Sequence, residues 1–201
     1  VLNGDRADTL LVSAKTGAGV SLFAVDRGAK GLSIQRIKTM DGGHAAMVKL
    51  AGVEGRLLGT DGGAAPALDA ALDLAAAGAC AEGHGIARTV LEMTNAYLKT
   101  RKQFGVAIGS FQVLQHRAVD MFVRTQLLES VWILAALKAQ DPNADERRRA
   151  VSIAKAQLAI GGKYVVAQGI QLHGGIGVTD EADVGLYFKR MTVLNALFGD
   201  E

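Results

Sequence analysis

Four side chains suited to holding a nucleotide lie close together in the middle of this 201-residue chain. Arg101, Gln103, Phe104 and Gln112 fall in a glycine-bracketed stretch between two long helical patterns. A guanidinium fork binds phosphate oxygens, and a neighbouring aromatic ring and amides suit a flat heteroaromatic ring. The stretch therefore predicts a nucleotide cofactor site. Its spacing alone leaves a second interpretation open, an exposed helix–helix corner with ordinary solvated charges.

Helical patterns surround this stretch. Apolar residues recur at helical spacing over 64–100 and again from 110 to about 140, with Ser110 as the expected N-cap of the second helix. An acidic start at Asp145 opens a third helix that ends at the Gly174-Gly175 break, and Asp180 opens a fourth that runs to about Leu197. Four helices with short connections predict an up-down-up-down bundle.

The first 60 residues predict a different structure. Short β patterns cover 10–14, 20–25, 32–37 and 46–53, and the glycine-containing turn at 15–19 indicates a hairpin. Four such strands cannot close a barrel by themselves. The expected fold is α+β by content and mainly α, with the remnant of a small antiparallel β-domain (1–60) followed by a helical-bundle domain (61–201).

Composition excludes several classes of function. Apolar residues make up 49% of the chain and its net charge is +2, so nothing indicates a nucleic-acid or anionic-membrane partner. A single cysteine, Cys80, excludes an intrachain disulfide and fits a buried packing position in a reducing cytoplasm. No histidine pair has metal-ligand spacing with a carboxylate, and no apolar run reaches the ~18 residues of a membrane span.

Two motifs carry a resemblance to a known family. The pattern Tyr97-x-x-x-Arg-x-Gln-Phe-Gly, followed after three residues by Ser-Phe-Gln, resembles the flavin-binding corner of the acyl-CoA dehydrogenase family. Farther along, Gln171-Leu-His-Gly-Gly-Ile-Gly-Val-Thr resembles the second flavin motif of that family. The motifs stand in the family's order and at about its separation.

The resemblance implies FAD as the cofactor. Arg101 is then expected to contact the flavin pyrophosphate, with Gln103, Phe104 and Gln112 beside the nucleotide end. The family shares each flavin site across a dimer, so the second motif is expected to reach the cofactor from the neighbouring subunit through Gln171, Gly174 and Gly175. His173, next to the glycines, is interpreted as a structural histidine, with a place in the lining of the flavin corner as the alternative.

The implied reaction is α,β-dehydrogenation of an acyl-CoA thioester in fatty acid metabolism, with hydride transfer to flavin and electrons passed to an electron-transfer flavoprotein. The implied assembly is a homo- or hetero-oligomer, a dimer or tetramer. The chain would cover part of the family's β-domain and most of its C-terminal helical domain, without the N-terminal helical domain.

The reaction needs a carboxylate base, and both usual positions for it are empty. In most members the base is a Glu before a Gly, and counting from the Gly-Gly pair puts Phe198 there. In a minority it is a Glu before an Arg near the start of the long helix, where this chain has Ala75. Asp200 is a candidate base if the local chain path differs, and Asp73 and Glu82 are two others.

Three interpretations of function therefore remain. The first is a flavin-dependent acyl-CoA dehydrogenase subunit or fragment. The second is a base-lacking partner that completes the flavin site of a heteromeric enzyme, because the Phe-Gly-Asp ending resembles the small-subunit type of bacterial dehydrogenases that act on steroid side chains or pimeloyl-CoA. The third is a cofactor-free helical interaction module.

Overall fold

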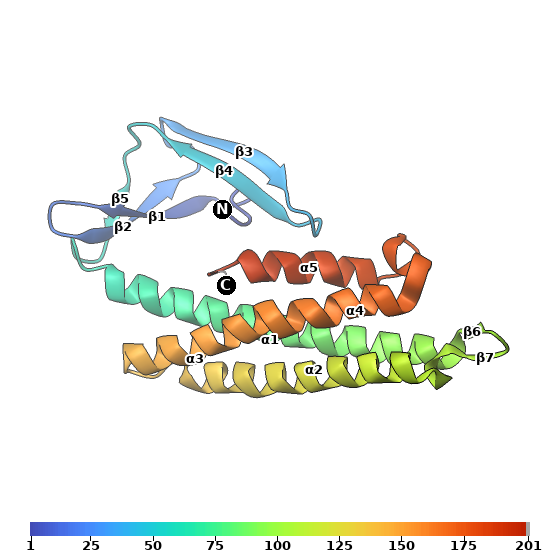
Figure 1. Ribbon diagram of the computed structural model, residues 1–201. Helices are drawn as coiled ribbons and strands as arrows, with labels where there is room; N and C mark the ends of the chain where they lie inside the picture. Colours follow the sequence, from blue (N-terminus) through green and yellow to red (C-terminus); the bar gives the residue numbers. More distant parts are fainter. Residues whose placement is uncertain (200–201) are drawn as a thin grey trace. The chain divides into compact units, whose positions relative to one another are not determined.

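The computed structural model describes residues 1–199, and the chain forms two compact units that meet between Ala71 and Leu72 (Figure 1). The first unit consists mainly of β-strands and the second mainly of helices, so the predicted α+β content is confirmed. None of the helices in the described part of the chain is long and apolar enough to cross a membrane.

Five strands form the first unit. Strands β1 (Thr9–Lys15) and β2 (Val20–Asp26) make the predicted antiparallel hairpin, and β5 (Arg56–Leu58) pairs with the other edge of β2. Strands β3 (Leu32–Lys38) and β4 (His44–Leu50) form a separate antiparallel pair. The sequence missed β5, because three residues are too few to show an alternating pattern. It also placed the fourth strand late, since the chain bends at residues 51–52.

A hydroxyl–carboxylate cluster joins the β1–β2 turn to the loop that follows β5. The hydroxyls of Thr16 and Ser21 donate to Asp61 Oδ1 at 2.7 and 2.5 Å, and the Gly62 amide donates to Ser21 Oγ at 2.7 Å. The hydrogen bond from Ser21, followed by that from Thr16, holds the pKa of the Asp61 carboxyl below its usual value. The cluster fixes the loop that leads into the first helix.

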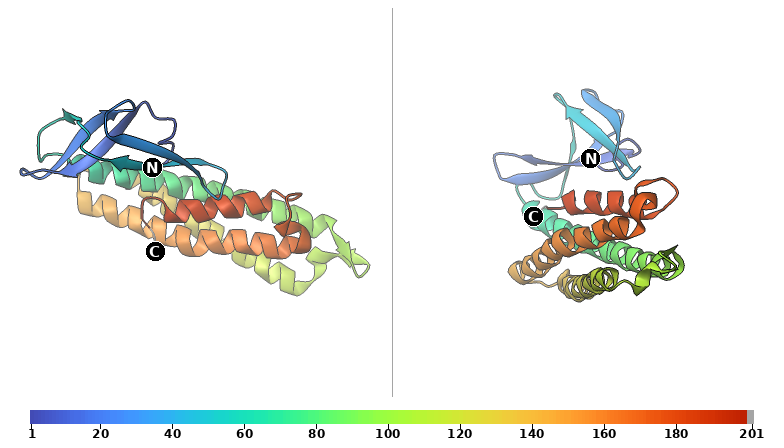
Figure 2. Two further views of the ribbon diagram at one scale, coloured as in Figure 1. Left: turned by 90° about the horizontal axis from the view of Figure 1, so that it is seen from above. Right: turned by 45° about the vertical axis from the view of Figure 1, so that its right-hand side comes forward.

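The helices are α1 (Ala65–Thr100), α2 (Gln112–Lys138), α3 (Ala144–Gln157), α4 (Lys163–His173) and α5 (Val184–Ala196). A π-helical turn, η2 (Leu158–Gly162), connects α3 to α4 without a break, so these segments form one rod. The four resulting rods lie side by side in both views of Figure 2 and alternate in direction, which confirms the predicted bundle (Figures 1 and 2).

Helix ends differ in detail from the sequence-based expectation. Ser110 is not the N-cap of α2, because residues Ile108–Ser110 form a 3₁₀ turn, η1, in which the Ser110 hydroxyl donates to the Ala107 carbonyl at 2.8 Å. Phe111 takes the N-cap position without a side-chain hydrogen bond. Helix α3 is capped by Asn143, whose Oδ1 accepts from two backbone amides. The last helix begins at Val184, after the turn η3 (Gly174–Val178).

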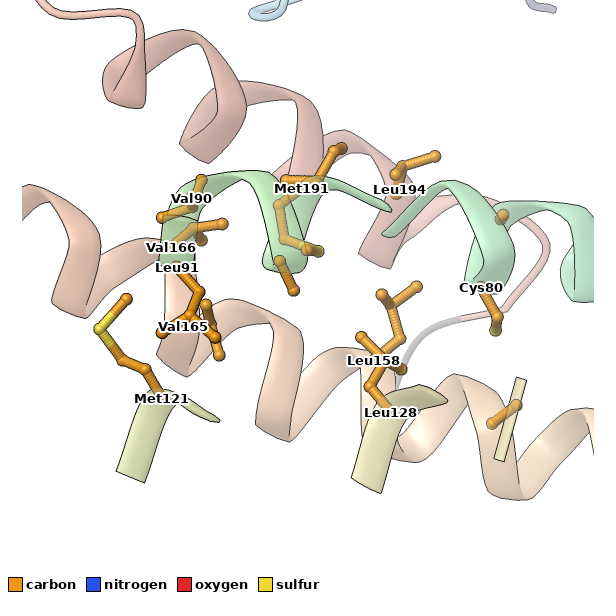
Figure 3. Close-up of a cluster of buried hydrophobic side chains, with 14 of the residues drawn as sticks. Cys80, Val90, Leu91, Met121, Leu128, Leu158, Val165, Val166, Met191 and Leu194 are labelled. Atoms are coloured by element: carbon orange, nitrogen blue, oxygen red, sulfur yellow. The ribbon is translucent and has the colours of Figure 1, made fainter. Parts of the chain in front are cut away.

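The core of the second unit runs between the rods. Figure 3 shows side chains from every rod converging there, among them the fully buried Met121, Leu128, Leu158 and Met191. Cys80 is fully buried in this cluster, and burial raises the pKa of its thiol to about 11, so the thiol stays protonated at neutral pH. The predicted packing role of Cys80 is confirmed.

Small residues let the rods approach closely. A Cβ on Gly83 of α1 would lie 2.2 Å from Leu158 Cδ1 of η2. A Cβ on Gly169 of α4 would lie 2.4 Å from Val90 Cγ1 of α1 and 3.1 Å from Val184 Cγ2. Glycine is therefore required at these helix crossings, although it weakens an isolated helix.

We predict opposite effects for two glycine-to-alanine changes. Gly169→Ala should lower the free energy of unfolding by about 1–3 kcal/mol, because the buried, stiff Val90 cannot move aside. Gly85→Ala in α1 is the matched control, since nothing lies within 4 Å of the added Cβ. That change should raise the free energy of unfolding by up to ~1 kcal/mol. Urea denaturation measures both, and equal effects at the two positions would contradict the close packing.

Candidate functional site

The stretch that was predicted to bind a nucleotide folds into a small hairpin at the end of α1. Strands β6 (Lys102–Gln103) and β7 (Val106–Ala107) pair across a two-residue loop, Phe104-Gly105, in which both residues have positive φ (+53° and +82°). Such loops are typical of tight hairpins. The Ile108 amide donates to the Arg101 carbonyl at 2.9 Å and closes the base of the hairpin. The sequence had predicted a plain loop here.

The second motif folds into a glycine turn at the end of α4. Gly174 has φ +65° and ψ −143°, a conformation almost exclusive to glycine, and its amide donates to the Gln171 carbonyl. A Cβ on Gly177 would lie 2.6 Å from the Ile170 carbonyl oxygen. Nothing lies within 4 Å of a Cβ built on Gly175. The fold itself therefore requires glycine at 174 and 177, whereas packing within the chain does not require it at 175.

A ring stack joins the two segments. The Tyr97 ring, one turn before the end of α1, lies on the His173 imidazole with centroids 4.6 Å apart and planes 25° apart. His173 is buried, and its Nδ1 lies 2.7 Å from the Gly169 carbonyl oxygen. A carbonyl can only accept, so Nδ1 carries the hydrogen. His173 is thus a satisfied structural histidine, as expected, and it also borders the site.

The two segments border an open pocket of about 630 Å³, within the usual range for small-molecule sites. Six of the seven predicted cofactor residues line it: Arg101, Gln103, Phe104, Gln171, Gly174 and Gly175. Gln112, the first residue of α2, is exposed and does not belong to this lining. Both motifs reach the pocket within one chain, so this juxtaposition does not need the neighbouring subunit that the resemblance implied.

The remaining walls, apart from His173, were not predicted to border the site. They are formed by Tyr97, Ile108, Phe111, Val113, Leu114, Leu172, His173 and Ile176. Most are apolar side chains at helical spacing, which a sequence pattern cannot tell from core residues. The signal available for some of them was their place inside a motif: Tyr97 and Phe111 in the first, and Leu172, His173 and Ile176 in the second.

Charge and aromatic surface are distributed unevenly in the pocket. Arg101 is exposed, and no carboxylate occurs among the lining residues. A bound anion would therefore not be repelled by a negative side chain in the pocket. Phe104 is 91% exposed in a left-handed backbone conformation, with its ring edge-on to Phe111 at 6.1 Å. Such a conformation costs a non-glycine residue about 1–2 kcal/mol. The pocket suits a ligand that combines phosphate with a flat ring.

The acids considered as bases are engaged elsewhere. Asp73 is buried and accepts from Arg147 Nε at 2.7 Å, and Glu82 accepts two hydrogen bonds from Arg190 at 2.6 and 2.9 Å. Neither lines the pocket. Ala75 lies partly buried within α1, and Phe198 follows the end of α5. Asp200 lies outside the described residues. Within residues 1–199, no group of three His, Cys, Asp or Glu side chains could hold a metal ion.

Comparison with known proteins gives consistent results. Residues 61–201 match the family model described as "Acyl-CoA dehydrogenase, C-terminal domain". The acyl-CoA dehydrogenase IpdE2 of Mycobacterium tuberculosis is 38% identical over 190 residues, which cover 94% of this chain and 52% of that protein. The chain spans about half the length of the curated relatives it matches.

Solved structures agree with this match. A structure titled "Tcur3481-Tcur3483 steroid ACAD G363A variant" superposes with a TM-score of 0.89 at 34% identity, covering 100% of this chain and 54% of that one. The ChsE4-ChsE5 complex from Mycobacterium tuberculosis superposes with a TM-score of 0.87 at 29% identity, with 100% and 54% coverage. The chain belongs to the acyl-CoA dehydrogenase family, and its residues 61–201 match that family's C-terminal domain.

Proposed function

We propose that this chain is a subunit, or part of one, of an FAD-dependent acyl-CoA dehydrogenase, and that the pocket between the two motifs holds the pyrophosphate and nucleotide end of FAD. The observation that carries the proposal is the pocket itself. It gathers six predicted cofactor residues from two segments that lie far apart in the sequence. Residues 1–60 would belong to the middle β-domain and 61–201 to the C-terminal helical domain.

The chemistry of the pocket supports a diphosphate ligand. Arg101 has a planar fork of donors and no carboxylate beside it among the lining residues, so its charge is available to phosphate oxygens. Gly175 has no packing reason to be glycine within the chain, and the absence of a Cβ there lets a phosphate approach the backbone closely. Together these features fit a phosphate held between Arg101 and the glycine turn.

The exposed ring of Phe104 supports the nucleotide part of the ligand. Its left-handed backbone and exposure both cost free energy in the isolated chain. Contact with a flat ring at this corner would offset part of that cost. When bound, FAD supplies the hydride acceptor for dehydrogenation of an acyl-CoA thioester, and an electron-transfer flavoprotein would then take the electrons.

A second candidate function is that of a base-lacking partner chain in a heteromeric dehydrogenase. Two observations favour it: Phe198 at the usual base position, and the arginine pairs that hold Asp73 and Glu82. Two of the similar structures, Tcur3481-Tcur3483 and the ChsE4-ChsE5 complex, are each named for two components. In this reading the chain completes a flavin site, and an unlike subunit supplies the proton-abstracting group.

Arg101→Ala in the complete protein should weaken FAD binding by roughly tenfold to a hundredfold in Kd, because a hydrogen bond to a charged group contributes about 1.5–3 kcal/mol. Flavin absorbance after desalting and titration of the apoprotein measure the change. Lys99→Ala is the control, since Lys99 is also exposed at the end of α1 but does not line the pocket. Equal flavin retention in both variants would contradict the role given to Arg101. Colourless wild-type protein with no thermal shift on adding FAD would favour the cofactor-free module.

Substitutions at the adjacent Gly174 and Gly175 should affect different properties, stability at the first and FAD binding at the second. Gly174→Ala should destabilise the protein by about 1–3 kcal/mol, because alanine is strained at this backbone conformation. Gly175→Ala should leave stability within about 0.5 kcal/mol of wild type yet weaken FAD binding, since its Cβ would enter only ligand space. Thermal unfolding and FAD titration of both variants test this, and unaltered FAD binding in Gly175→Ala would contradict the assignment.

The two candidate functions differ in the source of the base. A partner chain purified alone should turn over no acyl-CoA, whereas co-expression with an unlike family member that retains the Glu-Gly pair should restore flavin reduction. Turnover by this chain alone would refute the partner function. Loss of that turnover in Asp200→Asn would then identify Asp200 as the base, with Glu181→Gln as the control for an exposed carboxylate.

A further inference from the structure

A buried lysine contacts the end of α5. Lys155, near the end of α3, is about nine-tenths buried. Its ammonium group donates to the carbonyl oxygens of Leu194 at 2.9 Å, Asn195 at 3.3 Å and Leu197 at 2.8 Å. A buried ammonium is unfavourable unless hydrogen bonds compensate for its lost water. These three hydrogen bonds offset part of that cost.

The contacts have the geometry of a helix C-cap. The last carbonyls of a helix lack partners within the helix, and they form the negative pole of its dipole. An ammonium group has three N–H donors and a positive charge, so it can donate to such oxygens and complement the negative pole of the helix. Lys155 therefore caps α5 from a different rod of the bundle, and its position is fixed by α3.

The chain immediately beyond this cap is left-handed. Leu197 leaves the helix at φ −84° and ψ 136°, and Phe198 and Gly199 follow with φ +58° and +115°. The left-handed region is unfavourable for a phenylalanine, and such a residue persists only where its surroundings hold it. The Leu197 carbonyl, one of the three acceptors, belongs to the peptide unit that leads directly into Phe198.

We propose that Lys155 is a positioning residue that fixes the turn at Phe198 and thereby sets where the side chain of residue 198 points. The link to catalysis rests on the proposed function, because only the family resemblance puts the base position at 198. In this chain the fixed side chain is an apolar ring, 43% exposed. It would form a wall of the acyl site and could not accept a proton.

The test places a probe on the positioned residue. With 4-fluorophenylalanine incorporated at position 198, the ¹⁹F spectrum of the wild-type chain should show one narrow line. Lys155→Met keeps the apolar stem but removes the donors, and it should shift and broaden that line. Lys163→Met, an exposed lysine eight residues along, is the control and should change nothing. An unchanged line in Lys155→Met would overturn the proposal.

Hydrogen exchange separates local positioning from general stability. In Lys155→Met, amides in the last turn of α5 should exchange about tenfold faster or more, while those in the middle of α1 and α2 keep their wild-type rates. A uniform increase over all helices would mean that Lys155 only stabilises the core, which contradicts the proposal. Neither the ¹⁹F spectrum nor hydrogen exchange requires flavin. A negative result would therefore refute the role of Lys155 without bearing on the proposed function.

A third measurement needs no substitution, in case Lys155→Met does not fold. In isotope-labelled wild-type protein, scalar couplings across hydrogen bonds should connect Lys155 Nζ to the carbonyl carbons of Leu194 and Leu197. Their detection would support the cap directly. A Lys155 ammonium that exchanges with solvent as fast as that of Lys163, without such couplings, would refute it.

Discussion

The stack of Tyr97 on His173 is the contact on which the site depends. It holds the end of α1 against the end of α4, and each of these ends carries one of the motifs. The hydrogen bond from His173 Nδ1 to the Gly169 carbonyl fixes the imidazole in place. Gly169 in turn packs against Val90 of α1, so the pocket rests on the same close helix crossing that stabilises the bundle.

Charged groups in the helical unit hold rods together. Asp73 with Arg147 joins α1 to α3, and Glu82 with Arg190 joins α1 to α5. The Asp73 pair is buried, and breaking such a pair leaves an uncompensated charge, which makes both partners structural. Asp73, one of the acids considered as the base, therefore has a structural role, and Arg101 is the formally charged side chain in the pocket lining.

Two non-glycine residues of the helical unit have a strained backbone conformation. Within residues 1–199, three non-glycine residues have positive φ: Asn3, Phe104 and Phe198. Phe104 forms the tip of the β6–β7 hairpin beside the pocket, and Phe198 follows the lysine-capped end of α5. Sites of this kind often keep strained residues because the surrounding structure is built to hold them. Phe104 lies within the first motif, whereas Phe198 lies in neither motif.

Much of the fold could be predicted from the sequence because its signals are local. The apolar periodicity of 64–100 predicted α1 to within a residue, and the Lys15–Gly19 turn predicted the β1–β2 hairpin. Sequence patterns did not predict the structure correctly where only two or three residues form an element or a cap. Examples are β5, the β6–β7 hairpin, and the replacement of Ser110 by Phe111 as the N-cap of α2.

The sequence by itself determined the residue types of the site: a guanidinium, amides, an aromatic ring and two glycines, in two motifs that resemble one family. Only the tertiary structure decided that both motifs meet in one pocket of one chain, that Gln112 lies outside its lining, and that Lys155 caps α5. The physical reason is that these relations join residues from different rods, and their distances depend on helix packing, which the local pattern of residues does not specify.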